Sequence, residues 1–137
     1  IVESGSSFSY VGAGLVVLLG VGRDDGPEQA RWLADKIAGL RVFPDAEGKL
    51  NLSLLDVGGE ALVVSQFTLW ADCSRGRRPS FTRAAAGPPA RELYELFVEC
   101  LRGLGLSVAT GSFGAMMDVS LVNQGPVTLL LDTEKTF

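Results

Sequence analysis

The chain has 137 residues, of which 47% are hydrophobic and 20% charged, an ordinary composition for one globular domain with a buried core. It contains no histidine, which excludes Ser-His-Asp and Cys-His catalysis and removes the usual ligand of catalytic zinc. The net charge is −4, and this disfavours strong nonspecific binding to nucleic acid, because such binding needs Lys and Arg to neutralise phosphates.

The same data indicate a cytoplasmic protein with no membrane segment. Cys73 and Cys100 lack CxxC or secreted-framework spacing, so we expect two reduced thiols and no disulfide. No apolar run reaches the length of a membrane span, and no basic segment is followed by a signal-peptide core. We expect a single domain over residues 1–137 that uses no metal and no other cofactor.

The first part of the chain predicts a buried strand followed by a helix. Residues 15–21 form a continuous apolar run closed by glycines, which is typical of a central strand buried on both faces. Residues 24–27 supply the acidic residues and the proline that begin a helix. The apolar positions that follow have helical spacing: Ala30, Leu33, Ile37 and Leu40. A short strand at 41–43 and turns at 45–48 and 57–60 complete this part.

A second buried strand is predicted at residues 61–69, and its end is polar. The alternation there puts Ser65 and Phe67 on one face of the strand and Gln66 and Thr68 on the other. Polar side chains at the end of a buried strand need hydrogen-bond partners or a ligand.

Residues 72–82 form a long loop without periodicity. It carries Arg75, Arg77 and Arg78 and ends with Pro-Ser-Phe-Thr at Thr82. Loops of this length in a compact domain are often functional or mobile. The arginine cluster is either a solvated charged loop or a local basic patch that binds nucleic acid.

The last part of the chain predicts a second helix and several strands. The helix begins at Pro88 and ends before Gly105. Its apolar stripe consists of Leu93, Leu96, Phe97, Cys100, Leu101 and Leu104. Strands are expected at 107–110, 117–122 and 127–131. Two helices with six or seven strands predict an α+β domain, in which a mixed or antiparallel sheet curls over the helices in a barrel-like manner.

The link between the last two strands is Asn123-Gln124-Gly125-Pro126. Gly125 has no Cβ, so the backbone can approach a ligand closely, and Pro126 has no N–H to give to a strand ladder. An X-Pro bond can be cis at low cost, and the sequence leaves cis or trans open. The link is either a plain turn or a ligand site built from main-chain carbonyls.

Taken together, Ser65–Leu69 (SQFTL) and Asn123–Thr128 (NQGPVT) resemble the two signature motifs of the D-aminoacyl-tRNA deacylases. The resemblance continues, in order, over nearly the whole chain. Further matching segments are Leu18–Val21, Lys36–Ile37, Leu40–Phe43, Gly48–Lys49, Asn51 with Ser53–Leu54, Arg78–Thr82, Leu93–Glu95 and Phe113–Ala115. The beginning departs from the family pattern. Residues 1–5 look like a strand end entering a turn, so we expect that the family's first strand, with its Gln-Arg-Val, is missing here.

The resemblance implies a reaction and an assembly. The reaction is hydrolysis of the ester that joins a D-amino acid, or glycine, to the terminal adenosine of tRNA. The assembly is a homodimer in which the Gly-Pro bond is cis and the loop of one subunit enters the site of the other. Gly125 and Pro126, with Asn123 beside them, would then bind the substrate ammonium and exclude an L side chain. Ser65 and Thr68 would bind the adenosine.

Two mechanisms are open. In the first, the 2′-hydroxyl of the terminal ribose assists the attacking water, and the strand end with Gln66 and Phe67 stabilises the oxyanion through backbone N–H groups. In the second, Thr82 is the nucleophile, although a threonine hydroxyl is weak without an adjacent base. Lys49 or a carboxylate would have to supply that base. We favour the first mechanism.

Other residues and other functions have competing interpretations. Phe113 and Met117 either flank the adenine or belong to the core. The arginine cluster is a candidate for contacts with acceptor-stem phosphates. The rival functions are an RNA 3′-end binding module without catalysis and an esterase or amidase with a Thr82 nucleophile. A sister deacylase class with a trans Gly-Pro bond has a motif resembling PQATL, and Ser65 and Phe67 disfavour it.

Overall fold

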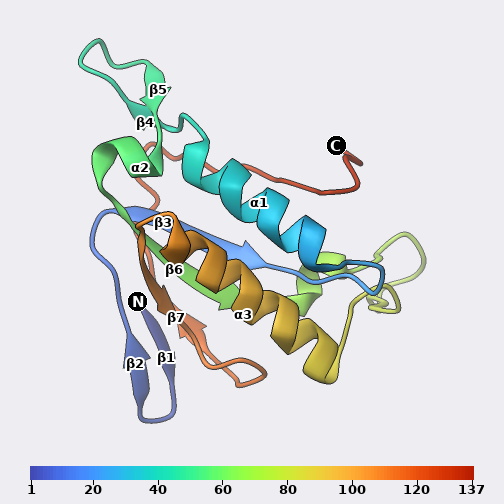
Figure 1. Cartoon of the computed structure of the whole chain (residues 1–137). Coiled ribbons are helices and arrows are strands. Elements are labelled where there is room, and N and C mark those ends of the chain that lie inside the picture. Colours follow the sequence, from blue (N-terminus) through green and yellow to red (C-terminus); the bar gives the residue numbers. More distant parts are fainter.

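A computed structural model describes all of residues 1–137 (Figure 1). The chain forms one α+β unit whose two long helices, α1 and α3, lie beside each other. In chain order the elements are β1 (Val2–Ser4), β2 (Ser7–Ser9), β3 (Gly14–Leu19), α1 (Pro27–Gly39), β4 (Phe43–Pro44), β5 (Leu50–Leu52), α2 (Leu54–Val57), β6 (Glu60–Ser65), the 3₁₀ helix η1 (Phe67–Trp70), α3 (Gly87–Gly103), β7 (Ser107–Thr110) and β8 (Asp118–Val119).

The strands form three separate sheets, with the orders β2-β1-β8, β3-β6-β7 and β4-β5. The β3-β6-β7 sheet is parallel, because α1 lies between β3 and β6 in the chain and α3 lies between β6 and β7, so both connections cross over. The other two sheets are antiparallel. The α+β class and the two main helices are confirmed, but the barrel-like curl is wrong: β3 and β7 stay unpaired edges of an open sheet.

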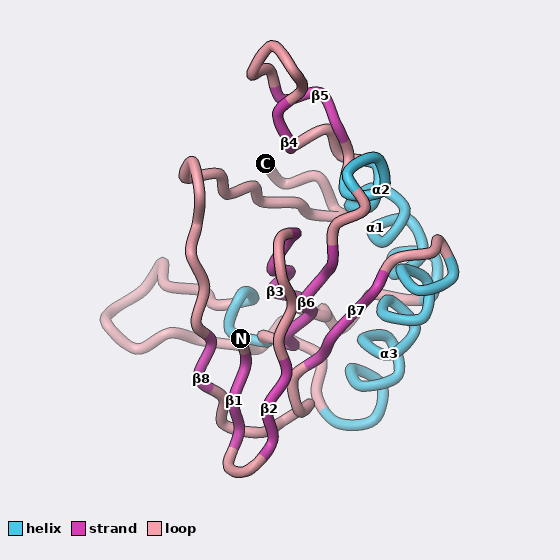
Figure 2. The backbone as a smooth tube through the Cα atoms, turned by 90° about the vertical axis from the view of Figure 1, so that its left-hand side faces the viewer, coloured by secondary structure: helices cyan, strands magenta, loops and turns pink.

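The molecule has three layers, with β6 in the middle one. Figure 2 shows the helices on one side of β3-β6-β7 and the β2-β1-β8 sheet on the other. Ala61 and Val63 of β6 join the core beneath the helices, while Leu62 and Val64 pack with Val2 of β1. Successive side chains of a strand point to opposite faces, so both faces of β6 are buried.

The prediction of a central strand at residues 15–21 is wrong in one respect. That segment forms β3, an edge of the parallel sheet. Val17 and Leu19 are buried, but Leu18 on the other face is 42% exposed. The central, doubly buried strand is β6. The first crossover connection places it beside β3, and the second places β7 on its other side.

Both helices lie close to their predicted positions. Pro27 begins α1 and Leu40 caps it. Helix α3 begins at Gly87, next to the predicted Pro88, and the chain reverses at Gly105, whose φ is +93°. The buried face of α3 is rotated from the predicted stripe and consists of Ala90, Tyr94, Phe97, Val98 and Leu101. Leu104 is 40% exposed, because the helix has ended and the chain turns toward β7.

The chain after β7 contains less strand than predicted. Of residues 117–122 only Asp118–Val119 pair, with Val2 and Glu3 of β1. Residues 127–131 form no strand, because no neighbouring strand lies beside them to complete a ladder. The chain start is a strand entering a turn, as predicted: β1 passes through Gly5, with φ +57°, into β2.

Two further features concern cysteines and membranes. Cys73 is exposed and Cys100 is half-buried against the core, and both are free thiols. Each helix is too short or too polar to cross a membrane.

Tyr94 links α3 to the central strand, and its ionisation makes the stability of the fold fall at alkaline pH. Its hydroxyl donates a hydrogen bond to the Val63 carbonyl, with an O–O distance of 2.8 Å. Burial raises the pKa of Tyr94 above its usual value. Since the folded-state pKa is the higher one, this stabilising contribution is complete below about pH 10 and is lost as the pH rises through the raised value.

We therefore predict that Tyr94→Phe flattens the alkaline loss of stability. The free energy of unfolding of the wild type should fall more steeply above about pH 10 than that of the variant. At neutral pH the variant should be less stable by about 1 kcal/mol, because the hydrogen bond is lost. Urea titrations over a pH series measure both effects. Tyr10→Phe, at a 67% exposed residue, is the control, and an equal flattening in it would contradict the prediction.

Candidate active site

The first part of the candidate site is the carboxyl end of β6. Ser65 is paired with Leu19 of β3, and the Gln66 amide donates to the Leu19 carbonyl at 2.8 Å. Open parallel sheets bind ligands at this end of their strands. The ladder stops here because β3 ends, and the chain turns into η1. The predicted alternation through Phe67 and Thr68 is therefore wrong, because these residues are helical.

The turn at η1 gathers polar groups of the SQFTL motif. The Gln66 side-chain amide donates to the Thr68 hydroxyl at 3.2 Å, and the Gln66 carbonyl accepts from the Leu69 amide at 3.3 Å. Phe67 and Thr68 occupy the first positions of η1, where amide N–H groups have no partner inside the helix. The strand end thus presents main-chain donors at the surface.

The arginine loop folds back so that its PSFT end lies beside the strand end. Asp72 and Ser80 close the loop with two backbone hydrogen bonds of 2.7 and 3.0 Å. The Phe81 ring contacts the Phe67 ring edge to face, with a centroid distance of 5.1 Å. Thr82 follows directly and is exposed. The structure therefore brings the PSFT segment and the SQFTL motif together.

No base is placed beside the Thr82 hydroxyl. Its oxygen makes no hydrogen bond within the chain. Lys49, one candidate base, is paired with Glu47 at 3.6 Å in the β4–β5 hairpin, which lies at the opposite end of the molecule from the arginine loop (Figure 1). The structure offers no activated threonine.

The second motif forms an exposed loop that its own asparagine holds together. The Asn123 side chain accepts from the Val127 amide and donates to the Thr128 hydroxyl, both at 2.9 Å. The Gly125–Pro126 bond is cis, and Gly125 has φ +134°. A Cβ on Gly125 would lie 2.8 Å from the Val127 side chain, so only glycine fits this turn without a shift.

Within one chain the two motifs do not meet. Their segments share no hydrogen bond, and the tube that leaves β8 turns at a corner of the molecule before it returns (Figure 2). The chain alone therefore leaves the Gly125–Pro126 loop apart from the Ser65–Thr68 strand end.

Phe113 and Met117 lie on opposite sides of the sheet layers. Phe113 packs against the core under the helices, with its ring 5.6 Å from that of Tyr94. It also lines a groove of about 350 Å³ between α3 and the end of β7, which Arg91 and Ser112 share. Met117 packs with the cluster around Val2. Both residues are half-buried, as core residues are.

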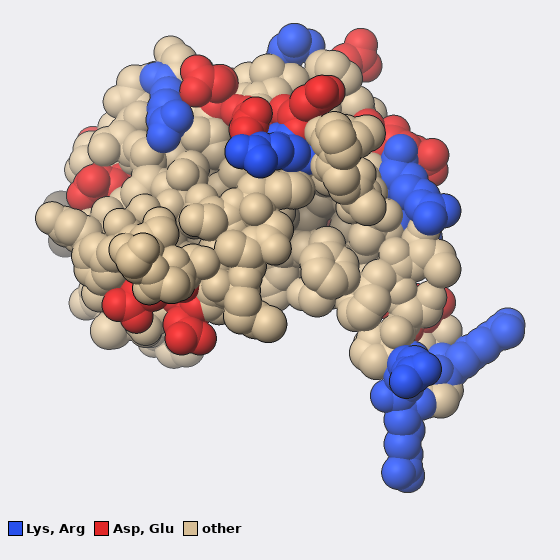
Figure 3. Space-filling model, turned by 90° about the horizontal axis from the view of Figure 1, so that it is seen from below, with Lys and Arg blue, Asp and Glu red and all other residues tan.

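The basic cluster is solvent-exposed. Arg75, Arg77 and Arg78 lie in the loop that Asp72 and Ser80 close. None of the four ion pairs of the chain includes these arginines. In Figure 3 long basic side chains project from one corner of the molecule, with no acidic atoms beside their ends.

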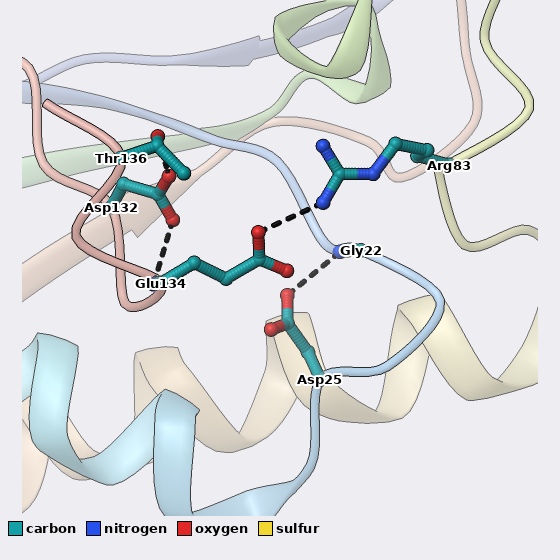
Figure 4. Close-up of polar contacts among 6 residues, drawn as sticks. All are labelled: Gly22, Asp25, Arg83, Asp132, Glu134 and Thr136. Carbon is teal, nitrogen blue, oxygen red and sulfur yellow. Dashed lines mark hydrogen bonds and ion pairs between the residues drawn. The ribbon is translucent and has the colours of Figure 1, made fainter.

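Next to the site lies a polar cluster that the sequence analysis does not identify. Arg83, which follows Thr82, forms an ion pair with Glu134 at 2.8 Å, and its guanidinium lies 4.8 Å from the centre of the Trp70 ring. Burial, followed by the nearby Glu134 and Asp132, raises the pKa of Asp25, although a hydrogen bond from the Gly22 amide lowers it. Figure 4 shows the side chains of Arg83 and Asp25 pointing toward that of Glu134. Their separation along the chain explains why no local motif signals them.

With this geometry established, comparison with known proteins gives a consistent result. The family described as "D-Tyr-tRNA(Tyr) deacylase" matches residues 1–132. The chain is 60% identical over 124 residues to a "D-aminoacyl-tRNA deacylase" of Thermotoga petrophila, covering 90% of this chain and 83% of that protein. It is 62% identical over 127 residues to that of Syntrophotalea carbinolica, covering 93% and 85%.

Solved structures agree. The structure titled "c-Myc DNA Unwinding Element Binding Protein" superposes with a TM-score of 0.88 at 38% identity, over 96% of this chain and 91% of that one. The structure titled "Structural Analysis of a probable eukaryotic D-amino acid tRNA deacylase" reaches a TM-score of 0.66 at 18% identity, over 85% and 84%, and shows a common fold. With a family match that spans both motifs, the chain belongs to the D-Tyr-tRNA(Tyr) deacylase family.

Proposed function

We propose that this chain, a D-aminoacyl-tRNA deacylase by family, hydrolyses the ester between a D-amino acid and the terminal adenosine of tRNA. Glycine mischarged on tRNA is a second substrate, and free amino acid and tRNA are the products. The observation that carries the proposal is the family match over residues 1–132, which includes both SQFTL and NQGPVT. The role is chiral proofreading in translation.

Selection works by exclusion rather than by recognition of the amino acid side chain. The loop around Gly125 and Pro126 is exposed and is closed by the Asn123 side chain. Its main-chain carbonyls bind the substrate ammonium and leave no space where an L side chain would project. Specificity of this kind comes from a clash with the wrong substrate. Such a site accepts many D-amino acids because it does not read their side chains.

The complete site requires two copies of the chain. Within one chain the Gly125–Pro126 loop and the Ser65–Thr68 strand end lie apart, so a second copy has to bring the loop to the strand end. The segment that carries the loop exposes large apolar side chains, with Leu121 at 55%, Val122 at 93% and Leu130 at 71% exposure. Exposed apolar patches of this kind mark interaction surfaces. The proposed assembly is a homodimer.

The chemistry depends on positioning and on main-chain donors. An aminoacyl ester is already activated, so orientation and oxyanion stabilisation supply much of the acceleration. The donor is the backbone N–H of Phe67, where β6 turns into η1, since the Gln66 N–H is already bound to the Leu19 carbonyl. The 2′-hydroxyl of the terminal ribose assists the attacking water. The unpaired Thr82 hydroxyl supports this route over a threonine nucleophile, which needs an adjacent base.

The remaining contacts hold the tRNA end. Ser65 and Thr68 bind the terminal adenosine. Phe113 and Met117 pack against two different core clusters, so they do not flank its base together. The unpaired Arg75, Arg77 and Arg78 contact acceptor-stem phosphates from the arginine loop.

The first test compares matched D-Tyr-tRNA and L-Tyr-tRNA mixed with catalytic amounts of the full chain. We expect rapid release of D-tyrosine and release of L-tyrosine at the spontaneous rate, because the loop excludes the L side chain. Measurement of the free amino acid over time gives both rates. Protection of either ester would instead establish a binding module without catalysis, and equal cleavage of both would refute selection by exclusion.

A second test separates the two mechanisms. We predict that Thr82→Val lowers kcat for the D ester by less than about tenfold, because the hydroxyl is not the nucleophile. Removal of a true nucleophile costs a factor of about 10³ or more. Single-turnover deacylation of D-Tyr-tRNA measures the effect, with Ser74→Ala in the same loop as control. A loss of the larger size would establish Thr82 as the nucleophile.

A further inference from the structure

We propose that Arg83 is a positioning residue, which fixes the PSFT segment against the C-terminal tail through its ion pair with Glu134. The inference rests on the proposed function, because it assigns the PSFT segment to the site. Arg83 directly follows Thr82, and Glu134 lies in the tail, six residues after Thr128. Glu134 lies beyond residues 1–132, the part that matches the family.

Three contacts hold Arg83 in place. Its Nη2 lies 2.8 Å from Glu134 Oε2, its guanidinium lies over the face of Trp70, and its carbonyl accepts from the Arg23 amide at 3.0 Å. Trp70 is fixed in turn, since a Cβ on Gly22 would lie 2.4 Å from the ring. Trp70 also ends η1, so the guanidinium sits between the SQFTL segment and the tail.

The tail is ordered around a carboxylate that presents Glu134. Asp132 accepts from the Glu134 amide at 2.9 Å and from the Thr136 hydroxyl, and its carbonyl accepts from the Lys135 amide at 3.0 Å. Leu131, just before this turn, packs against the core beneath the helices. The ion pair therefore holds the ordered tail against the residue that follows the PSFT segment (Figure 4).

The ion pair between Arg83 and Glu134 aligns the segments that it joins more than it stabilises the fold. The two side chains are 62% and 37% exposed, and exposed ion pairs stabilise proteins little. The surroundings nevertheless favour a cation at this place, because the carboxylates of Glu134 and Asp132 lie near that of Asp25 and Arg83 lies near Asp132. A contact that adds little stability and ties the PSFT segment to the C-terminal tail is suited to alignment.

The alternative role for Arg83 is a direct contact with a tRNA phosphate, and Glu134→Gln separates the two roles. This change removes the partner charge and leaves the arginine in place. If Arg83 bound phosphate, release from Glu134 would lower KM and leave kcat unchanged. As a positioning residue it should lose alignment, so kcat for D-Tyr-tRNA should fall by about tenfold with KM retained.

The experiment pairs these kinetics with amide hydrogen exchange of the full chain. In Glu134→Gln we expect exchange at Arg23 and Lys135, whose amides donate to the carbonyls of Arg83 and Asp132, to be at least about threefold faster than in the wild type. Glu47→Gln, which removes the acid of another exposed ion pair, is the matched control. The double variant Arg83→Gln with Glu134→Gln should be no slower in kcat than Arg83→Gln alone, because both changes break one contact.

Two results would overturn the inference: exchange in Glu134→Gln equal to that in Glu47→Gln, or a lower KM with kcat unchanged. If the wild type cleaved neither ester, the proposed function would fail. The exchange measurement alone would then decide whether Arg83 aligns the two segments.

Discussion

The burial of β6 between two apolar layers is the interaction on which the other parts of the structure depend. Ala61 and Val63 contact the helices, and Leu62 and Val64 contact the N-terminal sheet. Burial of the Val and Leu side chains is worth roughly 1.5–3 kcal/mol each. This strand fixes the positions of α1, α3 and β1 at once. Its carboxyl end is therefore the most firmly placed part of the surface, and the SQFTL motif begins there.

From this rigid strand end the site extends outward into less firmly held segments. The backbone of η1, the PSFT segment and the NQGPVT loop are all exposed, and each is held by a few hydrogen bonds or ring contacts. In the proposed mechanism the strand end supplies donors to stabilise an oxyanion, and the loop supplies acceptors to bind an ammonium. Because these two halves lie apart within one chain, the proposed dimer takes part in the chemistry and not only in stability.

The sequence predicts those features that depend on local patterns. The apolar run before Ser65 predicts a buried strand ending at the motif, and the proline and glycine signals place both helices within a residue or two of their observed starts. The predictions that fail are those that depend on which strands lie next to each other. Residues 15–21 have the composition of a central strand but lie at an edge, and residues 127–131 look like a strand but have no neighbouring strand to pair with.

For the same reason, no sequence pattern predicts the Arg83–Glu134 pair. The two residues are 51 positions apart, and neither belongs to a recognisable motif. Only the fold of the C-terminal tail brings them together. Conversely, the motifs themselves can be identified from the sequence, because SQFTL and NQGPVT are short, specific and local, and they carry the family resemblance.

The central claim is that this site uses main-chain groups and the substrate's own hydroxyl in place of a side-chain base. The most direct measurement is single-turnover hydrolysis of D-Tyr-tRNA whose terminal ribose lacks the 2′-hydroxyl, compared with the normal ester. The account predicts unchanged binding and a rate lower by a factor of about 10² or more, the usual size of a general acid–base contribution. Equal rates for the two esters would contradict it and would require a catalytic group on the protein.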